Sequence, residues 1–150
     1  LIMCGERKYM KNKMTISFSA LAENEQFART AVAAFMMSLN PTVEAVTDVK
    51  TAVSEAVTNS IIHGYSDGNG IVTVSCEIDN GALHIEVADS GVGIKDLKSV
   101  LEPFVTSRPF DERSGMGFTI MKTFMDGFDV KSCENEGTVV YMTKIIDNAS

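Results

Sequence analysis

The chain has 150 residues, a length typical of one domain, and 45% of them are hydrophobic, which is enough to form a core. A charged fraction of 22% alongside that hydrophobic content excludes an intrinsically disordered chain. The formal net charge of −7 argues against a protein that binds nucleic-acid phosphates, and it permits a basic protein partner.

The cysteines do not predict a disulfide or a zinc site. Cys4, Cys76 and Cys133 are far apart and in no Cys-x-x-Cys spacing. Small strand cysteines in a reducing compartment are the better interpretation, so we expect a cytoplasmic protein. No apolar run approaches the roughly 18 residues of a membrane span, and the first residues lack a signal-peptide core. We expect an N-terminal extension of unknown status (residues 1–13), one domain (14–147) and a short tail (148–150).

The first half of this domain predicts a strand followed by two helices. Residues 14–19 alternate apolar and polar side chains, as a half-buried strand does. Apolar residues recur at helical spacing over 24–39, and Asn40-Pro41 ends that helix. Thr42 is a suitable N-cap for a second helix that continues to Gly64. The buried stripe expected on this second helix consists of Val46, Val49, Val53, Ala56 and Ser60.

The second half predicts two hairpins with a loop and a helix between them. Asn80-Gly81 is a strong hairpin turn between two alternating segments. The expected elements are strands at 72–78 and 83–87, an irregular loop or lid at 94–113, a helix at 118–125, and strands at 130–133 and 138–145. Helices beside a mostly antiparallel sheet indicate an α+β fold, a two-layer α/β sandwich with the helices on one face.

Glu55, Asn59 and His63 occur at every fourth position of the second predicted helix. Positions four apart differ by only about 40° around an α-helix, so we expect the three side chains on one face. A carboxylate there can accept a proton from a hydroxyl nucleophile, and an amide oxygen suits Mg²⁺. The alternative is a solvated polar face that ends in a histidine, and the spacing alone favours that alternative.

Asp89-Ser90-Gly91-Val92-Gly93 follows directly on the second strand of the first hairpin. The Asp89 carboxylate can accept a hydrogen bond from the amino group of adenine, and the glycines allow the backbone to approach a ligand closely. An ordinary turn aspartate before a glycine is equally compatible with this string.

Ser114-Gly115-Met116-Gly117 precedes the third predicted helix. Exposed backbone N–H groups at a helix N-terminus bind phosphate, and Arg113 is the adjacent cation for a β- or γ-phosphate. The alternative is a plain loop-to-helix junction with a surface arginine. The string is not a P-loop, because no Gly-Lys-Ser/Thr follows, and it is not the Rossmann fingerprint, because no parallel βαβ unit surrounds it.

The order and spacing of these strings resemble the GHKL (Bergerat-fold) ATPase superfamily over nearly the whole chain after Lys13. Within it, the chain is most similar to the small serine kinases that act as anti-sigma factors in sporulation. The likeness is closest in Ser54-Glu55-Ala56-Val57-Thr58-Asn59, in the segment from Glu112 to Met121, and in residues 24–29.

The resemblance implies an ATP site that uses Mg²⁺. Glu55 would be the catalytic general base and Asn59 the Mg²⁺ ligand, while Asp89 would bind adenine in a pocket shaped by glycines. A lid and a phosphate-binding turn would supply further contacts. The complete set expected to bind ATP is Asn59, His63, Asp89, Gly91, Gly93, Thr106, Ser107, Arg113, Ser114, Gly115, Met116, Gly117 and Thr138. Val139 follows Thr138 where the family has a second threonine.

The resemblance also implies partners. The protein would inhibit an RNA polymerase sigma factor of sporulation and would phosphorylate a serine of a STAS-type anti-anti-sigma protein, which inactivates that antagonist. Arg29, on the polar side of the first helix, would contact both partners, although by itself it is a solvated arginine. A homodimer would form through residues of about 14–39, and neither nucleic acid nor membrane is an expected partner.

Three alternatives stay open at this point. A stress-response anti-sigma-B-type kinase has the same chemistry and a different sigma factor. A nucleotide-gated anti-sigma binder without kinase activity needs Asp89 and the glycines but no base, and the presence of Glu55 argues against it. The ATPase domain of a larger machine or histidine kinase needs a further domain, for which 150 residues leave little room.

Overall fold

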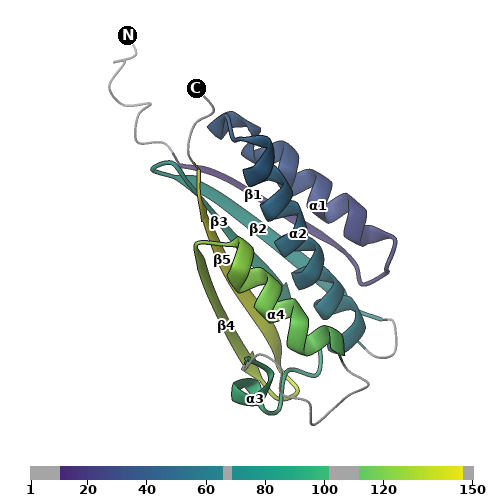
Figure 1. The fold of residues 1–150 in the computed structure, drawn as a ribbon. Helices are drawn as coiled ribbons and strands as arrows, with labels where there is room; N and C mark the ends of the chain where they lie inside the picture. Colours follow the sequence, from purple (N-terminus) through teal and green to yellow (C-terminus); the bar gives the residue numbers. More distant parts are fainter. Residues whose placement is uncertain (1–10, 66–68, 102–111, 147–150) are drawn as a thin grey trace.

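The computed structural model describes residues 11–65, 69–101 and 112–146. In these ranges a five-stranded antiparallel sheet in the order β1-β2-β3-β5-β4 carries helices on one face (Figure 1). This arrangement confirms the predicted two-layer α+β sandwich. The elements are β1 (Asn12–Ser19), α1 (Asn24–Phe35), the 3-10 turn η2 (Met36–Leu39), α2 (Val43–Asn59), the π-helical turn η3 (Ser60–Gly64), β2 (Ile71–Asp79), β3 (Ala82–Asp89), α3 (Leu97–Leu101), α4 (Glu112–Phe124), β4 (Gly127–Cys133) and β5 (Gly137–Ile145).

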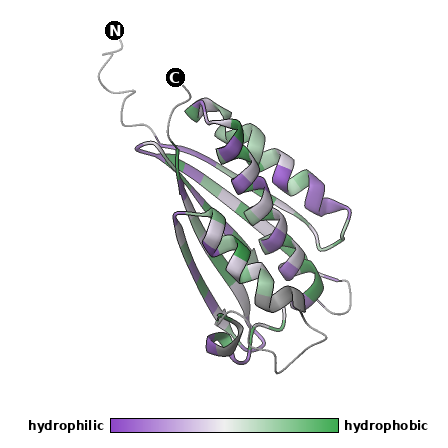
Figure 2. Ribbon diagram, in the orientation of Figure 1, coloured by the Kyte–Doolittle hydropathy of each residue, from purple (hydrophilic) through white to green (hydrophobic). Residues whose placement is uncertain are grey.

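The alternation along each strand separates a helix-covered face from an open face of the sheet. In β2, Val72, Val74 and Cys76 are buried under the helices, while Thr73 and Ser75 between them lie on the open face. The hydroxyl groups on the open face pair across the strands, as Thr73 Oγ1 of β2 does with Ser17 Oγ of β1 at 2.9 Å. Figure 2 shows this change between hydrophobic and hydrophilic residues along the strands and helices. The core therefore lies entirely between the two layers.

Helix α2 lies between α1 and α4 and forms the centre of the helical layer (Figure 1). Its N-cap is the predicted one, since Thr42 Oγ1 accepts a hydrogen bond from Ala45 N at 3.1 Å. The buried face is wider than the predicted stripe because helices pack on both of its sides. Its buried residues are Ala45, Val49, Ala52, Val53, Ala56 and Val57, and Val46 of the predicted stripe is only half-buried.

The end of this helix differs from the prediction. The α-helix stops at Asn59, and Ser60 to Gly64 form a π-helical turn where a continuous α-helix was expected. The wider turn carries Gly64 to the end of β3, where its carbonyl oxygen accepts a hydrogen bond from Val92 N at 3.0 Å. Tertiary contact therefore determines this terminus, and π-helical turns are frequent at functional sites.

Both predicted hairpins are present. Asn80 and Gly81 have φ angles of 52° and 78°, the left-handed pair that a two-residue type I′ turn requires. The β4–β5 hairpin turns through Asn135, which also has a positive φ of 64°. β4 is longer than predicted, because it begins at Gly127 rather than at residue 130.

The predicted start of the third helix was wrong. Helix α4 begins at Glu112, six positions before the expected start, so Gly115 and Gly117 lie inside it. Glycine is disfavoured in helix interiors, but here the missing side chain of Gly117 lets α4 approach α2 closely. The segment 94–113, predicted to be irregular, contains the short helix α3, and residues 102–111 lie outside the described ranges.

Lys144 of β5 connects the sheet to the helical layer at the end of the sheet opposite Asp89. Its Nζ donates to Asp48 Oδ2 of α2 at 3.2 Å and to the carbonyl oxygen of Phe124, the last residue of α4, at 2.7 Å. The cation therefore satisfies a terminal carbonyl group of α4 and forms a mostly buried ion pair with α2. No helix within the described ranges is long and apolar enough to cross a membrane.

Candidate functional site

A row of polar side chains closes the helix-covered face of the sheet at one end. In the strand register Asp89 of β3 lies opposite Thr138 of β5, which lies opposite Ser132 of β4. Residues opposite one another share a face, so this polar row continues the face whose other rows form the core. Asp89 is only 9% exposed, which places a carboxylate at the border of the core.

One oxygen of the Asp89 carboxylate is engaged by the protein. Oδ1 accepts a hydrogen bond from Gly91 N at 3.0 Å. The carboxylate lies against the bare Cα of Gly64, where an added Cβ would be 3.0 Å from Cγ of the aspartate. Among the described residues Oδ2 has no hydrogen-bond partner, so it can accept a bond from an amino group such as that of adenine.

Two glycines after Asp89 are required by close backbone contacts. A Cβ on Gly91 would lie 1.9 Å from the carbonyl oxygen of Gly64. Gly93 has a φ of +72°, and a Cβ there would lie 2.1 Å from the carbonyl oxygen of Cys133. These contacts hold the loop after β3 against both η3 and the β4–β5 hairpin, and the pocket-shaping role of both glycines stays a prediction.

Glu55 and Asn59 are brought together opposite α4. A Cβ on Gly117 would be 3.0 Å from Asn59 Nδ2 and 3.3 Å from Glu55 Oε2. Asn59 Nδ2 is inaccessible to solvent and has no hydrogen-bond partner among the described residues. A buried amide with an unused donor beside a carboxylate is costly unless a ligand completes it.

This pair fits Mg²⁺ held together with phosphate. Within the described ranges no group of three or more histidine, cysteine or acidic side chains forms an all-protein metal cage. Mg²⁺ does not need such a cage, because it takes one or two protein oxygens and completes its shell with phosphates and water. The oxygen of Asn59 that would hold the ion is Oδ1, because the amide nitrogen is a donor only.

His63 is half-buried in the π-helical turn. Glu55 and Asn59 both belong to α2 and keep α-helical spacing, whereas His63 lies beyond the end of that helix. The predicted ATP-binding role of His63 therefore stays a prediction that helical spacing no longer supports.

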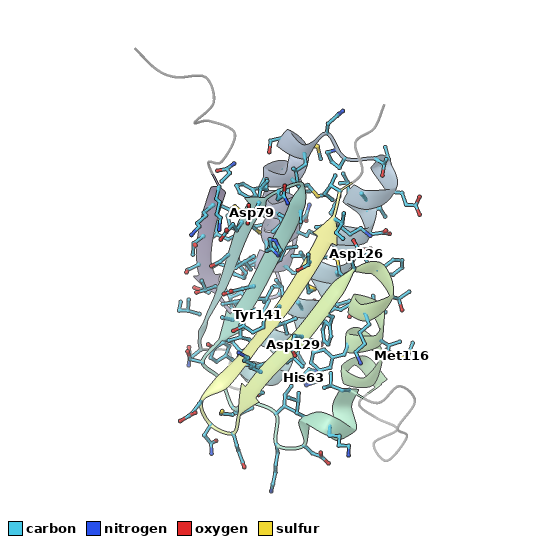
Figure 3. All side chains as sticks on the ribbon, turned by 90° about the vertical axis from the view of Figure 1, so that its left-hand side faces the viewer. His63, Asp79, Met116, Asp126, Asp129 and Tyr141 are labelled. Atoms are coloured by element: carbon cyan, nitrogen blue, oxygen red, sulfur yellow. The ribbon has the colours of Figure 1, made fainter. Side chains whose placement is uncertain are left out.

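The predicted phosphate-binding residues lie at the start of α4. Arg113, Ser114 and Gly115 belong to the first turn of that helix rather than to a turn ahead of it, and their side chains lie outside the described part. Gly117 is buried against α2, whereas Met116 is 44% exposed and Figure 3 shows it on the side of α4 that faces away from the sheet. The predicted lid residues Thr106 and Ser107 lie outside the described residues.

Thr138 takes part in a hydroxyl network that the sequence did not indicate. Its Oγ1 lies 2.7 Å from Ser132 Oγ, which also accepts a hydrogen bond from Ile94 N at 2.7 Å. Ser132 thus fixes the loop beyond Gly93 to the β4–β5 hairpin. Only the strand register would have identified Ser132, because nothing in its own sequence neighbourhood is distinctive.

Arg29 and Glu55 line one polar hollow of about 290 Å³ between α1 and α2. Arg29 is partly buried there, with its Nε 3.4 Å from Glu25 Oε1 one helical turn earlier. Glu55 therefore borders the hollow on one side and faces Gly117 of α4 on the other. The complete lining is Arg29, Thr47, Lys50, Thr51, Ser54 and Glu55.

Comparisons with known proteins show the family of the chain. Residues 18–144 match the family model described as the histidine kinase-like ATPase domain. The chain is 54% identical over 138 residues to the anti-sigma F factor of Geobacillus kaustophilus (strain HTA426), covering 91% of this chain and 94% of that protein. It is 58% identical over 134 residues to the anti-sigma F factor of Clostridium novyi (strain NT), covering 89% and 94% of the two chains.

Solved structures share the fold. The RsbU and RsbW domains of Rv1364c from Mycobacterium tuberculosis match with a TM-score of 0.68 at 16% identity, covering 93% of this chain and 34% of that one. The catalytic domain of the histidine kinase ThkA matches with a TM-score of 0.56 at 17% identity, covering 91% of this chain and 99% of that one. At these identities the likeness is one of fold.

Proposed function

Because the chain belongs to the anti-sigma F factor family of histidine kinase-like ATPase domains, we propose that it is an anti-sigma factor and an ATP-dependent protein-serine kinase. It binds and inhibits the sporulation sigma factor sigma F. It also transfers the γ-phosphoryl group of ATP to a serine of a STAS-type anti-anti-sigma antagonist.

The position of Glu55 carries this proposal. The carboxylate lies between Gly117 and Asn59 on one side and the hollow that contains Arg29 on the other. A serine hydroxyl that enters from the hollow would therefore meet Glu55 before it met the phosphates. A domain that only binds nucleotide has no need of a carboxylate between its nucleotide site and a partner surface.

Asp89, Asn59 and Glu55 each have a role in the transfer of the phosphoryl group. Asp89 orients the adenine through Oδ2, and Asn59 holds Mg²⁺, which neutralises the phosphate charge when bound. Glu55 accepts the proton of the serine hydroxyl as its oxygen attacks the γ-phosphorus, and ADP leaves with the bridging oxygen. The missing side chain of Gly117 leaves room for the side chains of Asn59 and Glu55, which a Cβ there would approach to 3.0 and 3.3 Å.

The charge of the protein supports release of the phosphorylated antagonist. A phosphoserine carries about −1.5 to −2 charges at neutral pH. The chain itself carries −7, so the modified antagonist is repelled and the surface becomes available for the sigma factor. Arg29, in the hollow, would contact the antagonist and the sigma factor in turn.

The test is a transfer assay with Mg²⁺, ATP labelled at the γ-phosphate and a purified STAS-type antagonist. We expect label on an antagonist serine, and we expect the Arg29→Ala variant to lose binding of both partners. The matched control is Lys131→Ala, which removes an exposed cation from the open face of the sheet. ATP binding without transfer would refute the kinase and leave a nucleotide-gated binder. Capture of sigma B in preference to sigma F would refute the sporulation assignment.

The proposal includes a homodimer through about residues 14–39. β1 is an edge strand of the described sheet, and Leu21 and Phe27 beside it are 43% and 52% exposed. An open edge with apolar neighbours suits a second copy. Light scattering should give a dimer for the native chain and a monomer for Phe27→Glu. Val43→Glu, at an 84% exposed valine of α2, should stay dimeric. A monomeric native chain would refute the dimer.

A further inference from the structure

Tyr65 joins the ends of β2 and β3 beside the candidate nucleotide site. Its hydroxyl donates to the carbonyl oxygen of Ile71 at 2.8 Å and accepts from Ser90 N at 2.6 Å. The ladder between the two strands ends at the pair Val72 and Asp89, so Ile71 and Ser90 are the next positions beyond it. The tyrosine hydroxyl therefore replaces a direct contact where the strands separate.

The three backbone N–H groups after Asp89 each have a different acceptor. Ser90 N donates to the Tyr65 hydroxyl, Gly91 N to Asp89 Oδ1, and Val92 N to the carbonyl oxygen of Gly64. Two of these acceptors, from Gly64 and Tyr65, come from the end of the helix that carries Glu55. The loop that presents the Asp89 carboxylate is thus fixed from outside at Ser90 and Val92.

The tyrosine ring is held in place by an adjacent glycine. A Cβ on Gly70 would be 2.3 Å from Cδ1 of Tyr65, so the ring lies directly on bare backbone. The carbonyl oxygen of Gly70 in turn accepts a hydrogen bond from Ala20 N at 2.9 Å. The ring position is therefore determined by the sheet rather than by solvent.

We propose that Tyr65 is a positioning residue for recognition of the adenine amino group. This inference rests on the proposed binding of adenine at Asp89. The hydroxyl fixes Ser90, and Ser90 fixes the direction of the neighbouring Asp89 side chain without any contact between Tyr65 and the nucleotide. Loss of the hydroxyl leaves Ser90 N–H and the Ile71 carbonyl oxygen without their partner, and the loop shifts.

The test compares ATP with inosine triphosphate, which lacks the amino group that Asp89 accepts from. Dissociation constants are measured by calorimetry with Mg²⁺ for the native chain and for Tyr65→Phe. We expect the affinity for ATP to fall about fivefold and that for inosine triphosphate to change less, so that the preference for ATP shrinks. The KM for ATP in phosphate transfer should rise by the same factor, with kcat unchanged.

Two further variants make the test independent of folding defects. Tyr141→Phe is the matched control, because Tyr141 lies on the open face of the sheet with Lys131 Nζ 5.5 Å from its ring centre (Figure 3). It should keep the native preference. Gly70→Ala retains the Tyr65 hydroxyl but displaces its ring, and it should reproduce the loss of preference.

The outcomes separate this inference from the proposed function. An equal loss of affinity for both nucleotides in Tyr65→Phe, or an unchanged preference, overturns the role of Tyr65 while Asp89→Asn still loses ATP. A native chain that binds the two nucleotides equally, together with an Asp89→Asn variant that binds ATP normally, overturns the adenine site and this inference with it.

Discussion

Gly117 of α4 lies directly against Asn59 of α2, and a Cβ added to the glycine would be 3.0 Å from Nδ2 of the asparagine. The contact explains how a glycine string and an acidic-amide helix, more than fifty positions apart, contribute to one site. It also brings Glu55 Oε2 within 3.3 Å of the same point. At this contact α4 contributes bare backbone rather than a side chain, which leaves room for the side chains of Asn59 and Glu55.

Gly117→Ala should therefore impair the site more than the fold. The new methyl group displaces Asn59, and we expect phosphate transfer to fall at least about tenfold, since misplacement of one catalytic group by a fraction of an ångström is sufficient. The free energy of unfolding should change by less than about 1 kcal/mol. The higher helix propensity of alanine offsets the strain that its methyl group causes against Asn59. Transfer rates and urea unfolding measure the two effects.

Thr123→Ala, at an exposed position of the same helix, is the control and should leave transfer unchanged. Native transfer rates in Gly117→Ala would show that the contact between α2 and α4 is irrelevant to catalysis.

Asp89→Asn should weaken ATP binding with little effect on stability. The amide keeps an oxygen for Gly91 N but places an NH₂ donor where the carboxylate had a second acceptor. A donor opposite the amino group of adenine should cost at least about tenfold in affinity, measured by calorimetry. Asp129→Asn, on the exposed face of the sheet, should bind ATP normally (Figure 3). Equal affinities for the two variants would contradict the assignment.

Lys144→Met should destabilise the protein without touching the site. It removes the ion pair with Asp48 and the hydrogen bond to the Phe124 carbonyl oxygen, and it leaves a mostly buried carboxylate unpaired. We expect a loss of about 2 kcal/mol in urea unfolding. Lys131→Met, at an exposed lysine, should stay within about 0.5 kcal/mol of the native value. Similar values for both variants would show that the contact contributes nothing.

Burial raises the pKa of the Cys76 thiol from 9.0 to about 12. The folded state therefore favours the neutral thiol, and this contribution to stability is complete below pH 9. It is lost as the pH rises from about 9 toward 12, at up to about 1.4 kcal/mol per pH unit. The Cys76→Ala variant should lose less stability than the native chain over that range. Parallel pH profiles for the two chains would contradict the shift.

Local rules account for the parts of the fold that the sequence predicted. Thr42 caps its helix through its own side chain, and Asn80-Gly81 makes its turn with two residues of positive φ. Both features depend only on neighbouring residues, so a single sequence contains the information.

Tertiary contacts account for the parts that the sequence did not predict. The π-helical turn ends at Gly64, which bonds to Val92, and the early start of α4 places Gly117, which packs on Asn59, inside the helix. Neither partner is near in sequence. The roles of Tyr65 and Ser132 were not predicted for the same reason. Each side chain accepts a hydrogen bond from the loop after β3, which is distant in sequence and close only in the folded sheet.

Glu55 is the residue that we propose as the general base of the serine kinase. The most direct measurement is single-turnover transfer from ATP to the STAS-type antagonist by Glu55→Gln, with nucleotide affinity measured on the same sample. We expect transfer to fall at least about a hundredfold and the ATP affinity to stay close to native, because the amide keeps the shape of the carboxylate but not its basicity. Native transfer rates in Glu55→Gln would show that Glu55 is not the general base.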